Sequence, residues 1–486
     1  MEEYKDLSEY ALEYARGKKC EYAEVRLETN NRDSIVFING KMHIGKLPFE
    51  LVTDAFSRKT GVNIRLLVNG GMGMATNNSL TKESIRKSIE HAFKTAKRSG
   101  DQRKNPIRMS EEKVHEIEWK SKYNINPMDV PLAEKIEFIQ DFINIFSEEK
   151  FQVNYIHIFV LINEQRDTYF INSDGAKISG HIPRVAFIPF IIGVKPGGKN
   201  EQSMSIFATS AGWDDLLSQN LKEKVKDKIR VIGDVILNAK KPPQGEMDLV
   251  LGPSVTGIIS HENCGHPHEA DRILGREGAQ AGESYLSQHK IGFKIGNDCV
   301  NVFEDPTIPG SYGFYLYDDE GVKASRRELI KNGLFNEMLQ NRETAAVFNT
   351  HSNAAARAIA YDKEPLIRMA NTYFAPGDFS FEEMIEDVKL GIFMKSFTEW
   401  NIDDKRLQAK YVGQEAYLIE NGEITDLVLR PTLEISTLGL FGSIDAQGKK
   451  ETIEWQGGYC GKSDPPQECP VWMGGSATRL RKVRLG

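Results

Sequence analysis

Two histidines and a glutamate lie within six residues, at His261, Glu262 and His266. Imidazole and carboxylate groups can hold a divalent metal beside a general base, and metal-assisted peptide hydrolysis requires that combination. The two histidines are five residues apart, whereas residues four apart share one face of a regular helix. Both imidazoles can therefore reach one metal only if the backbone between them departs from a regular helix.

The residues that end this motif favour such a departure. Gly265 relaxes the backbone just before His266, and Pro267 removes the next amide donor. We expect the helix to end, bulge or kink near Gly265 and to bring His266 back toward His261. The spacing therefore predicts a metal-binding motif on a distorted helix.

Glu262 is expected to face the interior of the protein. It continues the helical spacing of an apolar stripe, Val255, Ile258 and Ile259. A buried carboxylate is costly unless it has a task or a partner. Burial should raise its pKa toward a value useful in general base catalysis, while a nearby metal should oppose that rise. We therefore predict that Glu262 is the general base that acts on a metal-bound water.

A catalytic zinc site needs a third protein ligand and an open position for water. Four residues are candidates for this ligand: Cys264, His268, Cys460 and Cys469. Cys460 lies beside a glycine in a segment that favours a tight turn, which would present its sulfur, and Lys462 could favour the thiolate. Spacing leaves the choice open, and each cysteine could instead be an inert buried thiol. Mixed imidazole and thiolate ligands favour zinc over other metals.

Several segments of the chain carry a resemblance to a known family. In order, they are Leu251-Gly252-Pro253, the histidine motif, Glu269-Ala270-Asp271, Asp318-Asp319-Glu320-Gly321, residues 329–333, 371–380 and 417–424, Cys460-Gly461-Lys462 and Met473-Gly474-Gly475. Together they resemble the TldD/PmbA metallopeptidase family. The similarity covers nearly the whole chain and is weakest between residues 100 and 150.

The resemblance implies roles for four residues. In the TldD branch of this family, the two motif histidines and the late cysteine bind zinc, and the motif glutamate is the base. These roles would fall on His261, His266, Cys460 and Glu262. The PmbA branch, also called TldE, usually lacks the motif and acts as a partner. This chain has the motif intact and therefore resembles the active subunit.

The resemblance also implies the substrate and the partner. The expected substrates are peptides or unfolded polypeptide segments, and the expected partner is a PmbA/TldE-like subunit, with a homodimer as the alternative. The chain departs from the family pattern at Cys264 and at Pro267-His268, where other small or apolar residues are more usual. Glu269 and Asp271 lie just downstream and could orient a ligand histidine.

A different class of function stays open at this stage. The chain could be a non-catalytic modulator or scaffold subunit with a structural metal site, closed by a fourth ligand such as Cys264 or His268, or it could be a binding subunit without a metal. A structural site has no need of an acid beside its first ligand. The presence of Glu262 therefore favours the hydrolase.

Composition sets the remaining expectations. For 486 residues we expect two domains, an N-terminal α+β domain over residues 1–240 and a C-terminal metal-binding catalytic domain over 241–486, because residues 240–245 are charged and rich in proline. The net charge of −7 argues against nucleic-acid binding. Five dispersed cysteines, no apolar signal core and no membrane-length apolar stretch predict a cytoplasmic protein with no membrane association.

The pattern of apolar residues predicts an α+β fold class with mixed and antiparallel sheets, flanking helices and the metal motif in the C-terminal domain. Helices are expected over residues 4–16, 81–99, 132–148, 214–237, 342–348 and 380–388. Strands are expected over 22–28, 34–37, 61–68, 72–76, 153–162, 168–171, 176–181 and 182–194. Hairpin turns are expected at Asn39-Gly40 and Asn69-Gly70, and residues 101–130 are expected to form a linker.

Overall fold

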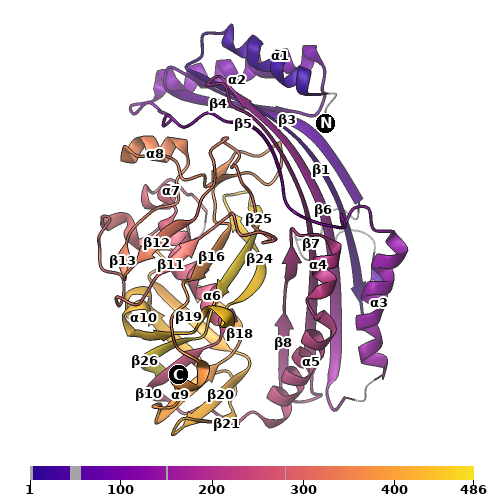
Figure 1. Cartoon of the computed structure of the whole chain (residues 1–486), viewed down its shortest axis with the longest axis vertical. Coiled ribbons are helices and arrows are strands. Elements are labelled where there is room, and N and C mark those ends of the chain that lie inside the picture. The colour runs from indigo at the N-terminus through magenta and orange to yellow at the C-terminus, as the bar shows by residue number, and fades with distance from the viewer. Residues whose placement is uncertain (1–3, 44–55, 149–150, 280) are drawn as a thin grey trace.

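The computed structural model describes residues 4–43, 56–148, 151–279 and 281–486. The first half of the chain, through residue 238, builds one sheet of long strands that curves over the second half (Figure 1). The second half, from residue 245, builds sheets of shorter strands around the histidine motif. The predicted α+β fold class, with mixed and antiparallel sheets and flanking helices, is confirmed.

The first half contains five helices and nine strands among its described residues. The helices are α1 (Lys5–Arg16), α2 (Lys82–Gln102), α3 (Leu132–Glu148), α4 (Trp213–Ser218) and α5 (Leu221–Asn238). The strands are β1 (Tyr22–Ile38), β2 (Lys41–His43), β3 (Phe56–Val68), β4 (Gly71–Asn77), β5 (Glu116–Lys120), β6 (Asn154–Asn172), β7 (Lys177–Val194), β8 (Asn200–Met204) and β9 (Phe207–Thr209). Their order in the sheet is β4-β3-β1-β6-β7-β5, with β2 beside β1 and with β8 and β9 beside β7.

Three strands of this sheet are longer than the sequence pattern predicts. The expected break between residues 28 and 34 is wrong, because β1 runs through its polar centre without interruption. That centre is paired on both sides, with Asn30 opposite Lys59 of β3 and Arg166 of β6. Its side chains also find polar partners, such as the Asp33 carboxylate with Lys135 Nζ at 2.7 Å. The strands β6 and β7 likewise each join two segments that were expected to be separate.

Two further expectations are corrected. The helix expected over residues 214–237 is two helices, α4 and α5, because Asn220 takes a left-handed conformation with φ of 53° between them. Residues 101–130 are not only a linker, since β5 pairs in parallel with β7. Both expected hairpins are present, β1 with β2 and β3 with β4.

The second half contains many short elements. Its helical segments are α6 (Pro253–Ile259), the π-helix η2 (Ser260–Gly265), the 3-10 helix η3 (His266–His268), α7 (Ala270–Ile273), η4 (Tyr285–Gln288), α8 (Arg342–Phe348), α9 (Phe381–Ile385), α10 (Thr437–Ser443) and η5 (Lys450–Thr452). Its strands are β10 (Gly245–Leu251), β11 (Val302–Glu304), β12 (Arg327–Lys331), β13 (Leu334–Phe335), β14 (Ala356–Arg357), β15 (Leu366–Ile367), β16 (Asn371–Phe374), β17 (Leu390–Met394), β18 (Phe397–Ile402), β19 (Gln408–Gly413), β20 (Ala416–Glu420), β21 (Glu423–Leu427), β22 (Thr432–Ser436), β23 (Ile444–Gln447), β24 (Glu454–Lys462), β25 (Gln467–Gly475) and β26 (Thr478–Leu485).

Two sheets of the second half enclose the histidine motif. One has the order β18-β19-β22-β26-β10-β17-β20-β21, with β23 beside β26, and the other has the order β13-β12-β11-β16-β25-β24. The motif follows β10, a central strand whose last three residues are almost fully buried. The largest apolar cluster of the described residues packs around it and includes Leu249, Val255, Ile258 and Cys460. The motif therefore lies in a buried core and not on a surface loop.

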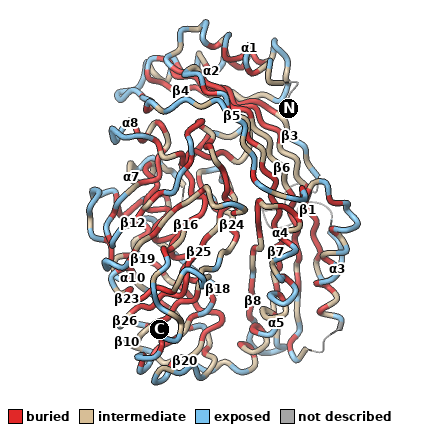
Figure 2. The backbone as a smooth tube through the Cα atoms, in the orientation of Figure 1, coloured by how far each residue is buried: buried red, intermediate tan, exposed pale blue. Residues whose placement is uncertain are grey.

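The curved sheet of the first half has helices on one face and the second half on the other. The helices α3, α4 and α5 bury a cluster that includes Phe142, Phe187 and Trp213. On the opposite face, Val160 and Ile188 pack against Tyr312, with Tyr459 and Trp472 at the edge of the cluster. Buried residues therefore continue from the sheet into the second half (Figure 2). Among the described residues, no helix is both long and apolar enough to span a membrane.

Candidate metal centre

The histidine motif is carried by a helix that changes its type twice. Pro253 starts α6 at the first helical position, where its missing amide hydrogen costs no hydrogen bond. The helix then widens into η2 and tightens into η3 at Pro267. The amide of His266 bonds to the carbonyl of His261, five residues earlier, as in a π-helix. The predicted distortion is confirmed, and its form is a widened turn.

This widened turn explains how the two histidines come together. A five-residue hydrogen bond adds one residue to the turn, so residues five apart come to lie on the same side. The rings of His261 and His266 have centroids 4.8 Å apart and an angle of 81° between their planes. Gly265 lies beside them, and a Cβ there would lie 1.9 Å from Met369 Sδ, so the buried Met369 side chain would have to move.

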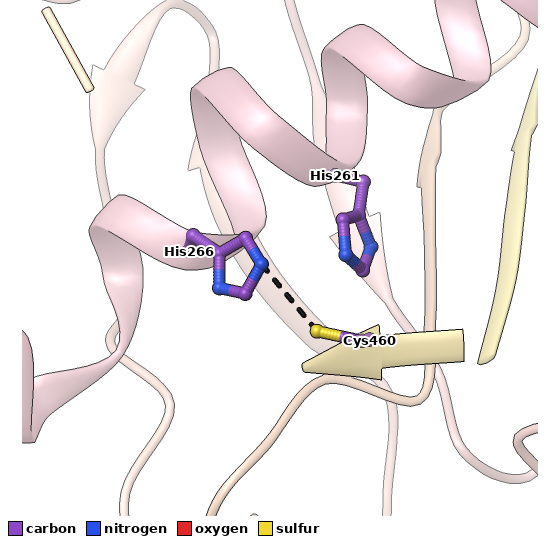
Figure 3. A group of neighbouring side chains, drawn as sticks. All are labelled: His261, His266 and Cys460. Atoms are coloured by element: carbon purple, nitrogen blue, oxygen red, sulfur yellow. Dashed lines mark hydrogen bonds between the residues drawn. The ribbon is translucent and has the colours of Figure 1, made fainter. Parts of the chain in front are cut away.

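Cys460 completes a cluster with the two histidines (Figure 3). One ligand atom from each of the three side chains lies within 4.8 Å of the others. The thiol sulfur of Cys460 is 3.4 Å from Nε2 of His266, and the ring of His261 lies beside them (Figure 3). The three residues are 3–4% exposed. No other cluster of three or more potential metal ligands occurs among the described residues.

Cys460 is held by a regular strand and not by the tight turn that the glycines suggested. It lies in β24 opposite Cys469 of β25. The buried guanidinium of Arg368 donates hydrogen bonds to the carbonyl oxygens of Cys460 and Gln467. Burial raises the pKa of the Cys460 thiol, but His266, Arg368 and His261 outweigh burial and lower that pKa well below its usual range. The cysteine side chain is therefore suited to be a thiolate.

Glu262 lies in η2 beside the cluster, and its carboxylate is paired with the guanidinium of Arg406. Burial raises the pKa of Glu262, but Arg406 and the two motif histidines outweigh burial and lower it. The sequence predicted a raised pKa for the Glu262 carboxyl, and that prediction is wrong. Its physical reason is an arginine 144 residues downstream, which no local spacing signals.

A buried ionic network supports the second histidine. Nδ1 of His266 lies 3.0 Å from the Glu269 carboxylate, so Nε2 is left to face Cys460. The same carboxylate accepts a hydrogen bond from Arg272 Nε at 2.5 Å and lies 3.4 Å from Lys462 Nζ. Asp271 contacts Lys462 at 2.7 Å and neither histidine. Of the two acids proposed to orient a ligand, the structure therefore brings only Glu269 to a histidine.

The other candidate ligands lie outside the cluster. Nδ1 of His268 bonds to the Cys264 carbonyl at 2.6 Å, and burial lowers the pKa of His268 to about 4. Burial raises the pKa of the Cys264 thiol well above its ordinary value, as expected of an inert core cysteine. Cys469 is buried on the strand beside Cys460. None of these three residues belongs to the His261, His266 and Cys460 cluster.

Comparison with known proteins identifies the family. Models of the PmbA/TldA metallopeptidase match domain 1 over residues 51–96, the central domain over 125–231 and the C-terminal domain over 244–485. A metalloprotease of Methanocaldococcus jannaschii is 32% identical over 462 residues, which cover 94% of this chain and 96% of that protein. The chain belongs to the PmbA/TldD metallopeptidase family.

Other PmbA/TldD relatives agree with this assignment. A protein of Saccharolobus solfataricus named zinc metalloprotease TldD homolog is 26% identical over 88% of this chain and 90% of its own length. The crystal structure of TldE from Thermococcus kodakarensis has the same fold, with a TM-score of 0.72. It covers 99% of this chain and 100% of its own at 17% sequence identity. The PmbA/TldD fold therefore extends over the whole chain.

Proposed function

We propose that this PmbA/TldD protein is a zinc-dependent peptidase that hydrolyses peptides or unfolded polypeptide segments. One observation carries the proposal: the ligand atoms of His261, His266 and Cys460 converge within 4.8 Å, beside a buried glutamate. A structural metal site does not need the adjacent Glu262. The non-catalytic modulator remains the second candidate, and no cluster of four ligands among the described residues favours it.

The residues present fit a zinc ion. Two imidazoles and a thiolate form a ligand set that zinc prefers, with a fourth position left for water. Nδ1 of His261 is buried and has no hydrogen-bond partner among the described residues, as expected of a nitrogen that awaits a ligand. The Glu269 carboxylate fixes the ring of His266, which is the usual support of a ligating histidine.

Each residue has a distinct task in the proposed reaction. When bound, zinc lowers the pKa of water and polarises the peptide carbonyl. Glu262 accepts the proton of the attacking water and later delivers it to the leaving amine. The ionised state of Glu262, maintained by Arg406, leaves its carboxylate able to accept that proton. Burial of the cluster limits the water that competes with these contacts.

The burial of the cluster also supports the substrate class. Because these side chains are 3–4% exposed, a substrate that contacts them must be narrow, and an extended segment is narrower than the surface of a folded protein. A PmbA/TldE-like partner is the expected second subunit, and a homodimer is the alternative. All five cysteines are free, in keeping with the reducing cytoplasm expected from the sequence.

The direct test is the Glu262→Gln variant. We expect it to retain one equivalent of zinc and to lose cleavage of a panel of unstructured peptides by at least about 100-fold, because the proton acceptor is gone. Zinc content and peptide cleavage are measured on the same preparation. The chelator 1,10-phenanthroline should abolish cleavage by the wild type, and added zinc should restore it.

The matched control is Glu343→Gln, at a half-buried glutamate that pairs with Arg276 and does not belong to the cluster. It should cleave at the rate of the wild type. Equal cleavage by Glu262→Gln and wild type would remove Glu262 from the reaction. Wild-type protein that holds zinc and cleaves no peptide, alone or with a PmbA/TldE-like subunit, would instead favour the modulator.

A further inference from the structure

A second charged side chain reaches the cluster from a distant turn. Arg406 lies between β18 and β19 and has φ of 58°, a left-handed conformation that is uncommon for arginine. The Asp403 carboxylate fixes this turn by accepting the amides of Leu407 and Gln408 at 2.6 and 2.8 Å. Strained backbone of this kind persists where the surrounding structure enforces it, often at functional sites.

The turn is also fastened to the motif helix itself. The hydroxyl of Thr437 donates to the carbonyl oxygen of Arg406 at 2.7 Å and accepts from the side-chain amide of Asn263 at 2.7 Å. Asn263 belongs to η2, between Glu262 and Cys264. The hydroxyl of the fully buried Tyr411 donates to the same Asn263 side chain. The position of Arg406 is therefore coupled to the widened turn that brings the histidines together.

The guanidinium of Arg406 is a buried cation with unused hydrogen-bonding capacity. The residue is 6% exposed, and its carboxylate partner among the described residues is Glu262, which contacts Nη1. Nε is buried and has no partner in the described part of the chain. Guanidinium presents several N–H donors in a fixed fork and stays charged at every working pH. Burial of such a group is costly unless it has a task beyond one ion pair.

The proposed reaction supplies a task for this cation. Attack on a peptide carbonyl develops negative charge on its oxygen, and fixed positive groups at that position give the largest single catalytic effect in many enzymes. Two acidic side chains, Cys460 and Glu262, already lie at the cluster and disfavour further negative charge there. A thiolate ligand also makes a bound metal a weaker electrophile than three imidazoles would. An additional cation beside Glu262 offsets both effects.

We propose that Arg406 is a catalytic residue that donates hydrogen bonds to the oxygen of the scissile carbonyl. This inference rests on the proposed peptidase function. As the water oxygen bonds to the carbonyl carbon, one proton passes to Glu262 and the carbonyl π electrons move to the oxygen. Arg406 stabilises this oxyanion. When the oxyanion collapses, the C–N bond breaks, and Glu262 returns its proton to the amine.

Arg406→Gln tests the proposal through kinetics. We expect kcat to fall by about 100-fold or more, KM to change by less than about fivefold, and the zinc content to stay at the wild-type value. Arg406→Lys keeps the charge without the fork and should recover part of the loss. The control Lys405→Gln removes an exposed cation from the neighbouring position of the same turn and should leave kcat unchanged.

A binding measurement separates oxyanion stabilisation from a role that only positions Glu262. The probe is N-phosphoryl-Leu-Ala, whose tetrahedral phosphoryl group copies the charge and shape of the intermediate, measured against plain Leu-Ala. We compare its Kd for Glu262→Gln with its Kd for Glu262→Gln/Arg406→Gln, both loaded with zinc. Glu262→Gln leaves the buried guanidinium of Arg406 without its carboxylate, whereas the double variant removes both charges, so the fold and zinc content of both proteins are compared before binding is measured. Direct contact predicts a loss of at least tenfold in phosphoryl-peptide affinity and none in Leu-Ala affinity.

Three results would contradict the proposed role of Arg406. Equal phosphoryl-peptide affinities of the two Glu262→Gln proteins would show that Arg406 acts only through Glu262. A phosphoryl peptide that binds wild type no better than Leu-Ala, or an unchanged kcat of Arg406→Gln, would also overturn the proposal. These results differ from failure of the proposed function, in which the wild type itself cleaves no peptide.

Discussion

At the scale of single residues, the two nitrogen atoms of His266 have different environments. Nδ1 faces Glu269 and Nε2 faces Cys460. A carboxylate on one nitrogen fixes the ring and increases the electron density that the other nitrogen can donate to a metal. Glu269 is itself held by Arg272 and Lys462. The ring of His266 is therefore held in one orientation by this network.

Removal of this support should weaken metal binding. Glu269→Gln keeps the size of the side chain and removes the acceptor charge, and we expect zinc affinity to fall by about 10–100-fold. Affinity is measured by competition with a chromophoric chelator. Asp271→Asn is the control, because Asp271 contacts the same lysine and neither histidine. Equal losses of zinc affinity in the two variants would contradict an orienting role of Glu269.

Some residues of the site could be predicted from the sequence, and others could not. His261, Glu262 and His266 are signalled by their own spacing, and the choice of Cys460 among four candidates came from the family resemblance. The structure brings Cys460 to the two histidines and leaves Cys264, His268 and Cys469 outside the cluster. Arg406 and Arg368 were missed, because a contact across 144 or 92 residues of chain leaves no local pattern.

At the scale of elements, one inserted residue in a helix decides the geometry of the centre. A regular helix would place the two imidazoles on different sides, whereas the π-helical hydrogen bond from His266 to His261 brings them to the same side. Ser260 supports the widened turn, since its hydroxyl lies 2.7 Å from the Gly257 carbonyl and 3.0 Å from that of Thr372. The need for a distortion follows from the sequence, but its type depends on these tertiary contacts.

Gly265 should be the most sensitive backbone position of this turn. Its φ is −53°, which alanine accepts, so the cost of Gly265→Ala comes from the contact of the new Cβ with Met369. We expect a loss of about 1–3 kcal/mol in stability and a loss of zinc binding. Gly442→Ala, in α10 with open space around its Cα, is the control.

The same contact gives a coupling test. Met369→Ala empties the position that the new Cβ would enter, so Gly265→Ala should cost less in the Met369→Ala background than in the wild type. Urea denaturation of the four proteins measures this difference. Strictly additive losses would show that the turn is limited by something other than the side chain of Met369.

The elements of the first half show what sequence patterns miss. Alternation located the strands, but it broke β1 at its polar centre, where strands on both sides keep the backbone paired. The pattern also predicted one helix where α4 and α5 are separate. The sequence shows only that an asparagine is present, and not whether it adopts a left-handed or a helical conformation. In both cases the local structure depends on its surroundings in the fold, and a linear sequence pattern does not contain that information.

At the scale of the whole molecule, buried ion pairs fasten the long sheet to the second half. Asp319 lies 3.1 Å from Arg166 of β6 and 3.3 Å from Arg26 of β1, and Glu320 lies 2.8 Å from Arg65 of β3. The segment Asp318-Asp319-Glu320-Gly321, part of the family resemblance, therefore has a structural role. Gly321 allows the close approach, since a Cβ there would lie 2.5 Å from Phe170.

Loss of one partner in this interface should be costly. Asp319→Asn removes the carboxylate shared by the buried Arg26 and the largely buried Arg166, which keeps its ion pair with Glu28. We expect a loss of about 3 kcal/mol in unfolding free energy. Asp298→Asn removes one exposed ion pair with Lys294 and should cost less than about 1 kcal/mol. Urea midpoints of both variants measure the difference. Similar midpoints would show that the apolar contacts alone hold the two halves together.

The fold class and the family could both be predicted from the sequence, and the relation between the halves could not. The α+β class followed from short alternating segments, and the family from motifs distributed along the chain. The curvature that brings β1, β6 and β7 over the loop that contains Asp319 depends on pairing between strands far apart in sequence. That pairing has no signature within any one strand.

The most direct test of the proposed metal centre is the zinc content of Cys460→Ser compared with that of Cys264→Ser. Each variant loses one buried thiol, but only the first belongs to the cluster with His261 and His266. We predict one zinc per chain in the wild type and in Cys264→Ser, and a loss of zinc with loss of peptide cleavage in Cys460→Ser. Zinc retained by Cys460→Ser and lost from Cys264→Ser would contradict the proposed metal centre.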